Sequence, residues 1–285
     1  MSGDTGVVLR RIMEIGIVSD EISLDFHEAV EYGTSWGIMK YEVRMLKTGR
    51  VPEVNSNEVQ DVLACIRGNG ITITALSPGL FKFPISNGDE ISRHLNVLLP
   101  KTLELAAKLG VDKIIVFGFQ REDKEPDSNL AKVIDYLNMA AVLVERAGMT
   151  LLVENEPGFW CDTGTNTALV LNKVESPSLK ANWDPCNAFG LGEEPYPGGY
   201  ESLNRFVAKV HVKDTRRGGL IECVPIGEGL VDWDGQLRAL VREQKVEYVT
   251  IETHCLPLIE KSKQNAETLR TMLEKIKGNQ HHRNS

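Results

Sequence analysis

LLVENEP (151–157) is the first of four apolar runs in the second half of this 285-residue chain that end in a polar residue. The other three are LKANWDP (179–185), AKVHVKD (208–214) and YVTIETH (248–254). Apolar runs of this length between turn residues are typical of buried strands, and buried strands that alternate with helices form parallel sheets. The residues that close the four runs are Glu154, Asp184, His211 and Glu252.

The first half of the chain repeats a helix-to-strand turn. An amphipathic stretch ends and an apolar run begins at each of four glycines, Gly37, Gly70, Gly110 and Gly148. Glycine tolerates the left-handed backbone conformation that ends a helix. The glycines are spaced by about 33 to 40 residues, which is the size of one βα unit.

The full pattern predicts eight strands in strict alternation with eight helices. We expect strands near 14–19, 40–45, 71–77, 112–118, 150–155, 178–184, 208–213 and 246–252. We expect helices near 23–36, 56–69, 90–109, 129–147, 163–175, 199–206, 232–244 and 262–277, with a kink at Pro100. This alternation predicts an α/β fold, a single (β/α)8 TIM barrel, and no G-x-G-x-x-G follows the first strand to favour an open sheet.

Composition narrows the classes of protein. No linker divides the chain, so we expect one domain over 1–285, with flexible tails at 1–12 and 278–285. A net charge of −8 disfavours nucleic acid and anionic membranes as partners, and no apolar run is long enough for a membrane helix. Five scattered cysteines without a Cys-x-x-Cys pair fit a reducing compartment, so we expect a cytoplasmic protein.

Strand parity places the four run-closing residues inside the barrel. Side chains alternate along a strand, so His211 points inward if Val210 and Val212 face the helices. The same parity turns the three carboxylates inward at the carboxyl-terminal mouth, where TIM barrels carry their chemistry. Taken singly, each residue can have a structural role in place of a functional one. Asp184 before Pro185 can be a turn residue, and His211 can be a core histidine.

Taken together, the four residues predict a metal site. Carboxylates crowded at one mouth repel each other unless a cation neutralises them. Three hard oxygen ligands and one imidazole favour Mn²⁺ or Mg²⁺ as the single bound ion, with Co²⁺ and Zn²⁺ as alternatives. The predicted metal ligands are Glu154, Asp184, His211 and Glu252.

Other side chains near the strand ends are candidates for substrate contact. Lys213 follows the seventh strand, where barrels frequently bind anions, although a solvated basic loop is an equal alternative. Trp160 can pack on a sugar face or anchor its loop. Glu42, late in the second strand, can hydrogen-bond a substrate hydroxyl or lie at the surface.

The motifs E-N-E-P, N-W-D-P, H-V-K-D and I-E-T-H, in this order, resemble the xylose isomerase-like TIM barrel superfamily of sugar isomerases and epimerases. The segment PIGEGLVDWDGQLRAL (225–240) is also similar to members of that superfamily, and the resemblance covers nearly the whole chain. It implies that the four matching residues bind one divalent metal, usually Mn²⁺, and that Glu154 and Glu252 also exchange protons with the substrate. It further implies a substrate-binding role for Arg217, six residues past His211.

The chain departs from the epimerases of that superfamily at two positions. Asn187 stands where they often carry a histidine, and Trp160 stands where they place a substrate-binding glutamate, with Glu156 near but not equivalent. These changes leave the predicted metal ligands intact and bear on the substrate. The complete predicted substrate-binding set is Glu156, Trp160, Asn187, Lys213 and Arg217.

The resemblance predicts an isomerase or epimerase of a ketose, sugar phosphate or related keto-sugar. The reaction would abstract a proton next to a carbonyl and pass through a metal-stabilised enediolate. Loss of hydroxide from the same enediolate would make the protein a dehydratase of an inosose-type ketone. A non-catalytic sugar-binding protein and an endonuclease IV-like hydrolase are weaker alternatives, because the acidic balance opposes DNA and only six histidines are present. Homo-oligomerisation stays open.

Overall fold

The strands close into the predicted barrel. The computed structural model describes residues 13–218 and 222–281, and within them eight parallel strands form a closed ring in the order β1-β12-β9-β8-β7-β6-β5-β2. The ring is made of β1 (Glu14–Val18), β2 (Lys40–Val43), β5 (Thr72–Leu80), β6 (Lys113–Phe117), β7 (Thr150–Glu154), β8 (Leu179–Trp183), β9 (Val207–Val212) and β12 (Tyr248–Ile251). The chain is therefore a single (β/α)8 barrel, as predicted.

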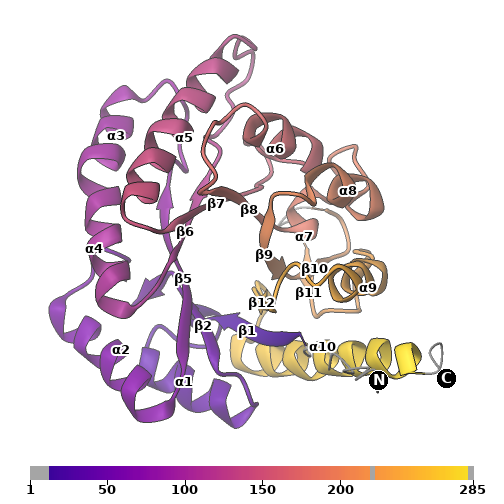
Figure 1. Ribbon diagram of the computed structural model, residues 1–285. Helices are drawn as coiled ribbons and strands as arrows, with labels where there is room; N and C mark the ends of the chain where they lie inside the picture. Colours follow the sequence, from indigo (N-terminus) through magenta and orange to yellow (C-terminus); the bar gives the residue numbers. More distant parts are fainter. Residues whose placement is uncertain (1–12, 219–221, 282–285) are drawn as a thin grey trace, which may run out of the picture.

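Helices surround the ring of strands, and α10 lies along one side of it beneath β1 (Figure 1). They are α1 (Phe26–Ser35), α2 (Ser56–Asn69), α3 (Gly88–Arg93), α4 (Leu99–Leu109), α5 (Asn129–Arg146), α6 (Gly164–Leu171), α7 (Pro185–Ala188), α8 (Tyr200–Leu203), α9 (Trp233–Glu243) and α10 (Leu258–His281). Short helical turns add η1 (Ser19–Glu21), η2 (His94–Leu98) and η3 (Pro195–Gly199). In the part of the chain that the structure describes, no helix has the length and apolarity needed to cross a membrane.

Several helices differ from their predicted extents; α6, for example, ends at Leu171 and not near 175, and α10 begins at Leu258 and not near 262. The expected helix 90–109 is divided by a π-helical turn, η2, in which the Leu99 N–H donates to the His94 carbonyl, and Pro100 lies in the first turn of α4. Proline has no N–H to donate, so the irregular turn falls just before it. Helix α10 continues past its expected end at 277 to His281. Of the predicted flexible tails 1–12 and 278–285, residues 1–12 and 282–285 lie outside the described residues, whereas 278–281 belong to α10.

Two small hairpins form in the loops at the carboxyl-terminal mouth of the barrel, and the sequence pattern did not predict them. The pair β3 (Met45–Leu46) and β4 (Gly49–Arg50) follows β2, and the pair β10 (Asp214–Thr215) and β11 (Cys223–Val224) follows β9. Each strand has only two residues, which is too short to show an alternating apolar pattern.

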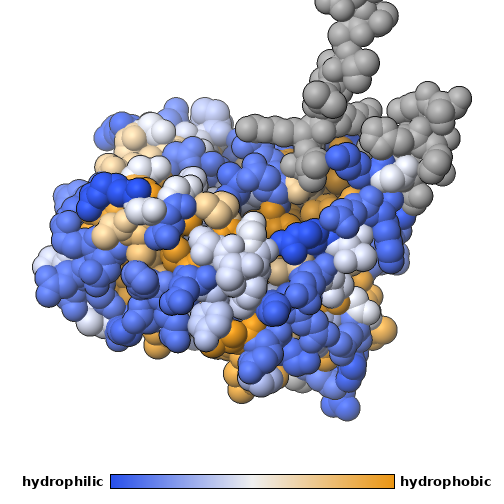
Figure 2. All heavy atoms as spheres, turned by 90° about the horizontal axis from the view of Figure 1, so that it is seen from below, coloured by the Kyte–Doolittle hydropathy of each residue, from blue (hydrophilic) through white to orange (hydrophobic). Residues whose placement is uncertain are grey.

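Most of the apolar core lies between the strands and the helices. A separate small cluster of Ala75, Ile115 and Leu152 comes from β5, β6 and β7. Leu152 shares the inward parity of Glu154, so this cluster belongs to the interior of the barrel. The outer faces of the helices are mostly hydrophilic, with apolar side chains between them, on the side over α1, α2 and α10 (Figure 2).

Candidate metal centre

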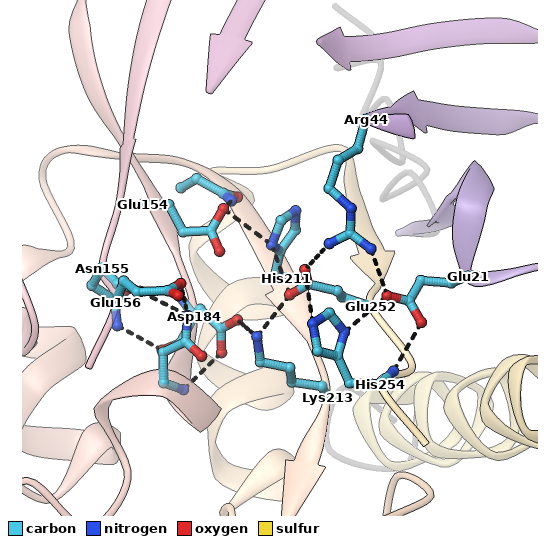
Figure 3. A network of polar contacts seen from close by, with 12 residues as sticks. Glu21, Arg44, Glu154, Asn155, Glu156, Asp184, His211, Lys213, Glu252 and His254 are labelled. Atoms are coloured by element: carbon cyan, nitrogen blue, oxygen red, sulfur yellow. Dashed lines mark hydrogen bonds and ion pairs between the residues drawn. The ribbon is translucent and has the colours of Figure 1, made fainter. Parts of the chain in front are cut away.

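Four side chains from neighbouring strands meet at the carboxyl-terminal mouth of the barrel (Figure 3). One ligand atom from each lies within 4.8 Å of the others, and all four side chains are buried. The four residues are Glu154, Asp184, His211 and Glu252. This is the arrangement that strand parity predicted; the role of these residues as ligands remains a prediction.

The His211 ring is oriented for a cation. Its Nδ1 is buried and has no hydrogen-bond partner among residues 13–218 and 222–281, and it lies 3.5 Å from Glu154 Oε2 and 3.4 Å from Glu252 Oε2. Its Nε2 lies 2.8 Å from Glu42 Oε2. Burial and Lys209 oppose protonation, yet the carboxylates of Glu42, Glu154 and Glu252 hold the pKa of His211 well above its usual range. The carboxylates around this ring therefore favour a positive charge at its position. Three carboxylates and one imidazole nitrogen are a donor set that fits a divalent ion.

Asp184 is held in place by Asn155 and Asn187, and neither of them contacts its Oδ2, which faces Lys213. Its backbone N–H donates to Asn155 Oδ1 at 2.8 Å, and its carbonyl accepts from Asn155 Nδ2 at 2.8 Å. Its Oδ1 accepts from the Asn187 N–H at 3.0 Å and caps α7. The turn role considered for Asp184 is therefore real, and it coexists with a place among the ligands.

Lys213 occupies the same cluster as a cation. Its Nζ lies 2.8 Å from Asp184 Oδ2 and 2.7 Å from Glu252 Oε2, and its side chain is buried. Burial opposes the charge of the ammonium, but the two carboxylates hold the pKa of Lys213 well above its usual range. The lysine thus compensates part of the negative charge that a divalent ion would neutralise.

A second network joins Glu252 to the loop after β1. Arg44 Nη1 donates to Glu252 Oε1 at 2.6 Å, and Arg44 Nη2 lies 2.8 Å from Glu21 Oε1 and 2.9 Å from Asp20 Oδ2. Glu21, Glu252 and His254 also lie close enough together to hold an ion. Since Arg44 already contacts both of those carboxylates, we interpret this group as an ion-pair network.

His254 is held in an uncommon conformation beside this network. Its φ of 50° lies in the left-handed region, which non-glycine residues rarely adopt. Glu21 accepts from the backbone N–H of His254 at 2.9 Å and lies 2.8 Å from its Nδ1. His254 Nε2 is 3.8 Å from Glu252 Oε1. Strain of this kind persists where the surroundings impose it, often at functional sites.

Two of the other predicted site residues adjoin the cluster. Glu156 is buried and pairs with Lys82 at 2.7 Å, and burial together with Glu154 raises its pKa despite that lysine. Asn187 donates to the Asn155 carbonyl at 2.8 Å and to Glu156 Oε2 at 3.4 Å. Asn187 Oδ1 has no hydrogen-bond partner within the described ranges of the chain. Both side chains are thus placed to extend the site on the Glu154 side.

Trp160 and Arg217 lie apart from the ligands. Trp160 is buried, no described residue forms a hydrogen bond with its indole N–H, and Arg121 stacks 4.3 Å from the ring centre. Arg217 is 74% exposed and pairs with Glu222 at 3.0 Å. Among residues 13–218 and 222–281, no hydrogen bond or ion pair joins either side chain to the four ligand residues. Their predicted substrate contacts stay predictions.

The sequence reasoning missed the charged partners of the site. Glu42 is 1% exposed and accepts contacts from His211 and Lys209, so the surface alternative considered for it is wrong. Burial alone would raise the pKa of Glu42, but Lys209 and His211 lower it to about 2. A signal was available in the run AKVHVKD, because Lys209 shares the inward parity of His211 and a buried lysine requires a carboxylate.

The closed (β/α)8 barrel and the carboxylate cluster at its mouth are the features by which this protein can be assigned to a family. The chain matches the xylose isomerase-like TIM barrel family over residues 28–276 and belongs to that family.

Its similarity to individual proteins is distant. It is 22% identical over 196 residues to the 3-dehydroshikimate dehydratase of Bacillus anthracis. The aligned region covers 60% of this chain and 66% of the dehydratase, so the chain spans just under two thirds of that protein's length. The structure of the IolI protein with a bound zinc atom superposes with a TM-score of 0.76 at 18% identity, covering 93% of this chain and 99% of IolI. The structure of L-ribulose 3-epimerase superposes with a TM-score of 0.77 at 16% identity, covering 96% of this chain and 98% of the epimerase.

Proposed function

We propose that this protein is a divalent-metal-dependent isomerase or epimerase of a ketose, sugar phosphate or related keto-sugar. The observation that carries the proposal is the convergence of three carboxylates and one imidazole nitrogen within 4.8 Å at the barrel mouth. An ion held by Glu154, Asp184, His211 and Glu252 would act as a Lewis acid that stabilises negative charge on substrate oxygens. Mn²⁺ is our first choice, and the zinc atom in the IolI structure keeps Zn²⁺ open.

Glu154 is the better placed of the two glutamates to remove a proton. Its Oε2 accepts from Asn182 Nδ2 at 3.0 Å, and no lysine or arginine among the described residues pairs with it. Glu252 pairs with Arg44 and Lys213. Burial opposes its ionisation, but Lys213, His254 and His211 hold the pKa of Glu252 well below its usual range. A carboxylate stabilised by cations is a weaker base. We therefore assign proton removal to Glu154.

Glu252 would return the proton as the second carboxylate of the pair. Delivery to the opposite face of the same carbon gives an epimer, and delivery to the neighbouring carbon gives an aldose–ketose isomer. Lys213 and Arg44 both contact Glu252, so they hold its carboxylate in one orientation for either outcome.

A metal-dependent dehydratase is the second candidate. The observation that favours it is the match to the 3-dehydroshikimate dehydratase of Bacillus anthracis. Proton abstraction by Glu154 would be the shared first step, and loss of hydroxide from the next carbon would replace reprotonation. The buried ammonium of Lys213, beside Asp184 and Glu252, could assist the departing hydroxide.

Solvent exchange tests both candidates. The protein is incubated in D₂O with Mn²⁺ and a panel of ketoses, ketose phosphates, keto-acids and inosose-type ketones. Deuterium next to a carbonyl in a recovered isomer supports isomerisation or epimerisation, and loss of one water from the product supports dehydration. No exchange and no product with any member of the panel would contradict the proposal.

Variants assign the exchange to the site. Glu154→Gln and Glu252→Gln should each abolish exchange while circular dichroism shows an intact fold. Glu228→Gln is the matched control, because Glu228 is an exposed carboxylate on a loop at the same end of the barrel. Full activity in either glutamate variant would refute its assigned role.

A further inference from the structure

Strand β9 carries a column of cationic side chains into the barrel. Lys209, His211 and Lys213 alternate with Val210 and Val212, and all three charged or titratable side chains are buried. His211 and Lys213 contact the candidate metal ligands. Lys209 lies deeper along the strand, and none of the candidate ligands is its partner among the described residues.

The partner of Lys209 comes from the far side of the ring. Glu42 lies in β2, which is separated from β9 by β1 and β12 in the closed order of strands. Its Oε2 lies 2.5 Å from Lys209 Nζ and 2.8 Å from His211 Nε2. The contact therefore crosses the interior of the barrel, and Glu42 is 1% exposed.

One oxygen of Glu42 thus links a lysine to the metal-binding histidine. A carboxylate accepts hydrogen bonds, so Nε2 of His211 is the ring nitrogen that donates to it. The other ring nitrogen, Nδ1, faces Glu154 and Glu252 and has no hydrogen-bond partner in the part of the chain that the structure describes. A ligating histidine generally donates its second N–H to such a partner, which fixes the orientation of the ring.

We propose that the buried Glu42–Lys209 pair positions His211 for metal binding: Glu42 accepts the Nε2 hydrogen, and Nδ1 is thereby presented to the ion. The inference rests on the metal site of the proposed function. Glu42 is a positioning residue here, since it reaches the ion only through His211. Lys209 neutralises Glu42, because a glutamate buried without a cation would be costly in the barrel interior.

Metal affinity and the identity of the ligating nitrogen test this directly. Mn²⁺ binding to the full chain is measured by electron paramagnetic resonance for the wild type, Glu42→Gln and the neutral double variant Glu42→Gln/Lys209→Met. We expect a 10- to 100-fold loss of affinity in both variants. In the Zn²⁺-loaded wild type, long-range ¹H–¹⁵N NMR should show His211 protonated at Nε2 and ligated through Nδ1.

A core variant separates positioning from general destabilisation. Leu240→Ala removes a fully buried side chain of α9 and should lower thermal stability without changing Mn²⁺ affinity. A folded Glu42 variant with a Mn²⁺ affinity within twofold of the wild type would overturn this inference, and so would ligation through Nε2. Neither result would contradict the metal centre itself. If the variants fail to fold, the NMR measurement on the wild type still decides. A wild type that binds neither Mn²⁺ nor Zn²⁺ would overturn the metal centre as well.

Discussion

Replacing Lys213 by methionine isolates the charge that the protein itself supplies to the site. The ammonium lies 2.8 Å from Asp184 Oδ2 and 2.7 Å from Glu252 Oε2, and the side chain is 1% exposed. Methionine has similar length and no charge, so packing is largely kept. Glu252 retains Arg44, whereas Asp184 loses the lysine that is its only ion-pair partner among the described residues.

The expected cost follows from that loss. Removing one partner of a buried ion pair costs about 3–5 kcal/mol, and the retained Arg44 contact points to the lower part of that range. For a chain of this size each kcal/mol shifts the melting temperature by roughly 2–4 °C. We therefore expect the metal-free variant to melt about 6–12 °C below the metal-free wild type.

Metal should reverse about half of this deficit. A divalent ion neutralises the carboxylates that the lysine neutralised, and it no longer meets a positive neighbour in the variant. We expect Mn²⁺ to bind Lys213→Met at least tenfold more tightly than the wild type, which corresponds to about 1.4 kcal/mol. Saturating Mn²⁺ should accordingly raise the melting temperature more in the variant than in the wild type.

The assay is differential scanning calorimetry of both proteins with chelator and with a Mn²⁺ series. Lys113→Met serves as the control, because Lys113 pairs with the exposed Asp112 near the opposite end of the barrel. Its Mn²⁺ response should equal that of the wild type. A Lys213→Met deficit that is the same with and without Mn²⁺, or a weaker Mn²⁺ affinity, would refute the reasoning.

Three shorter predictions concern acid, close packing and metal removal. The lowered pKa of Glu42, about 2 against an ordinary 4.5, stabilises the fold above pH 4.5, and this contribution is lost as pH falls toward 2. The stability advantage of the metal-free wild type over Glu42→Gln, measured by urea unfolding, should therefore shrink by about 2 kcal/mol between pH 6 and pH 3; an unchanged difference would contradict the ionic role of Glu42. Gly164→Ala should lower the melting temperature, because the new Cβ would overlap the backbone of Gly199, and an unchanged melting temperature would show that this contact can relax. Chelation should abolish deuterium exchange and added Mn²⁺ should restore it, whereas exchange that persists in chelator would exclude a metal-dependent reaction.

Local patterns were sufficient for the strands and for bringing the four candidate ligand residues to one site. Their parity depends only on neighbours such as Val210 and Val212, and their common level follows from the parallel arrangement of the strand ends. The interior position of Glu154 and His211 could therefore be predicted without knowing any long-range contact.

The partners of those residues were not accessible in the same way. Glu42 and His211 are 169 positions apart, and Arg44 and Glu252 are 208 apart, so only the closed ring brings them together. Arg44 also depends on the loop after β2, which forms the unpredicted β3–β4 hairpin. Loop geometry of this kind leaves no periodic trace in the sequence.

The alternation of charged and apolar side chains on β9 also bears on how the barrel assembles. If β9 slipped by one residue against its neighbours, Lys209, His211 and Lys213 would turn toward the apolar helix layer. Val210 and Val212 would then face unneutralised carboxylates. The misaligned strand would bury cations without counterions and leave anions unpaired. The charged residues of the site therefore also favour the correct register of β9 when the ring closes.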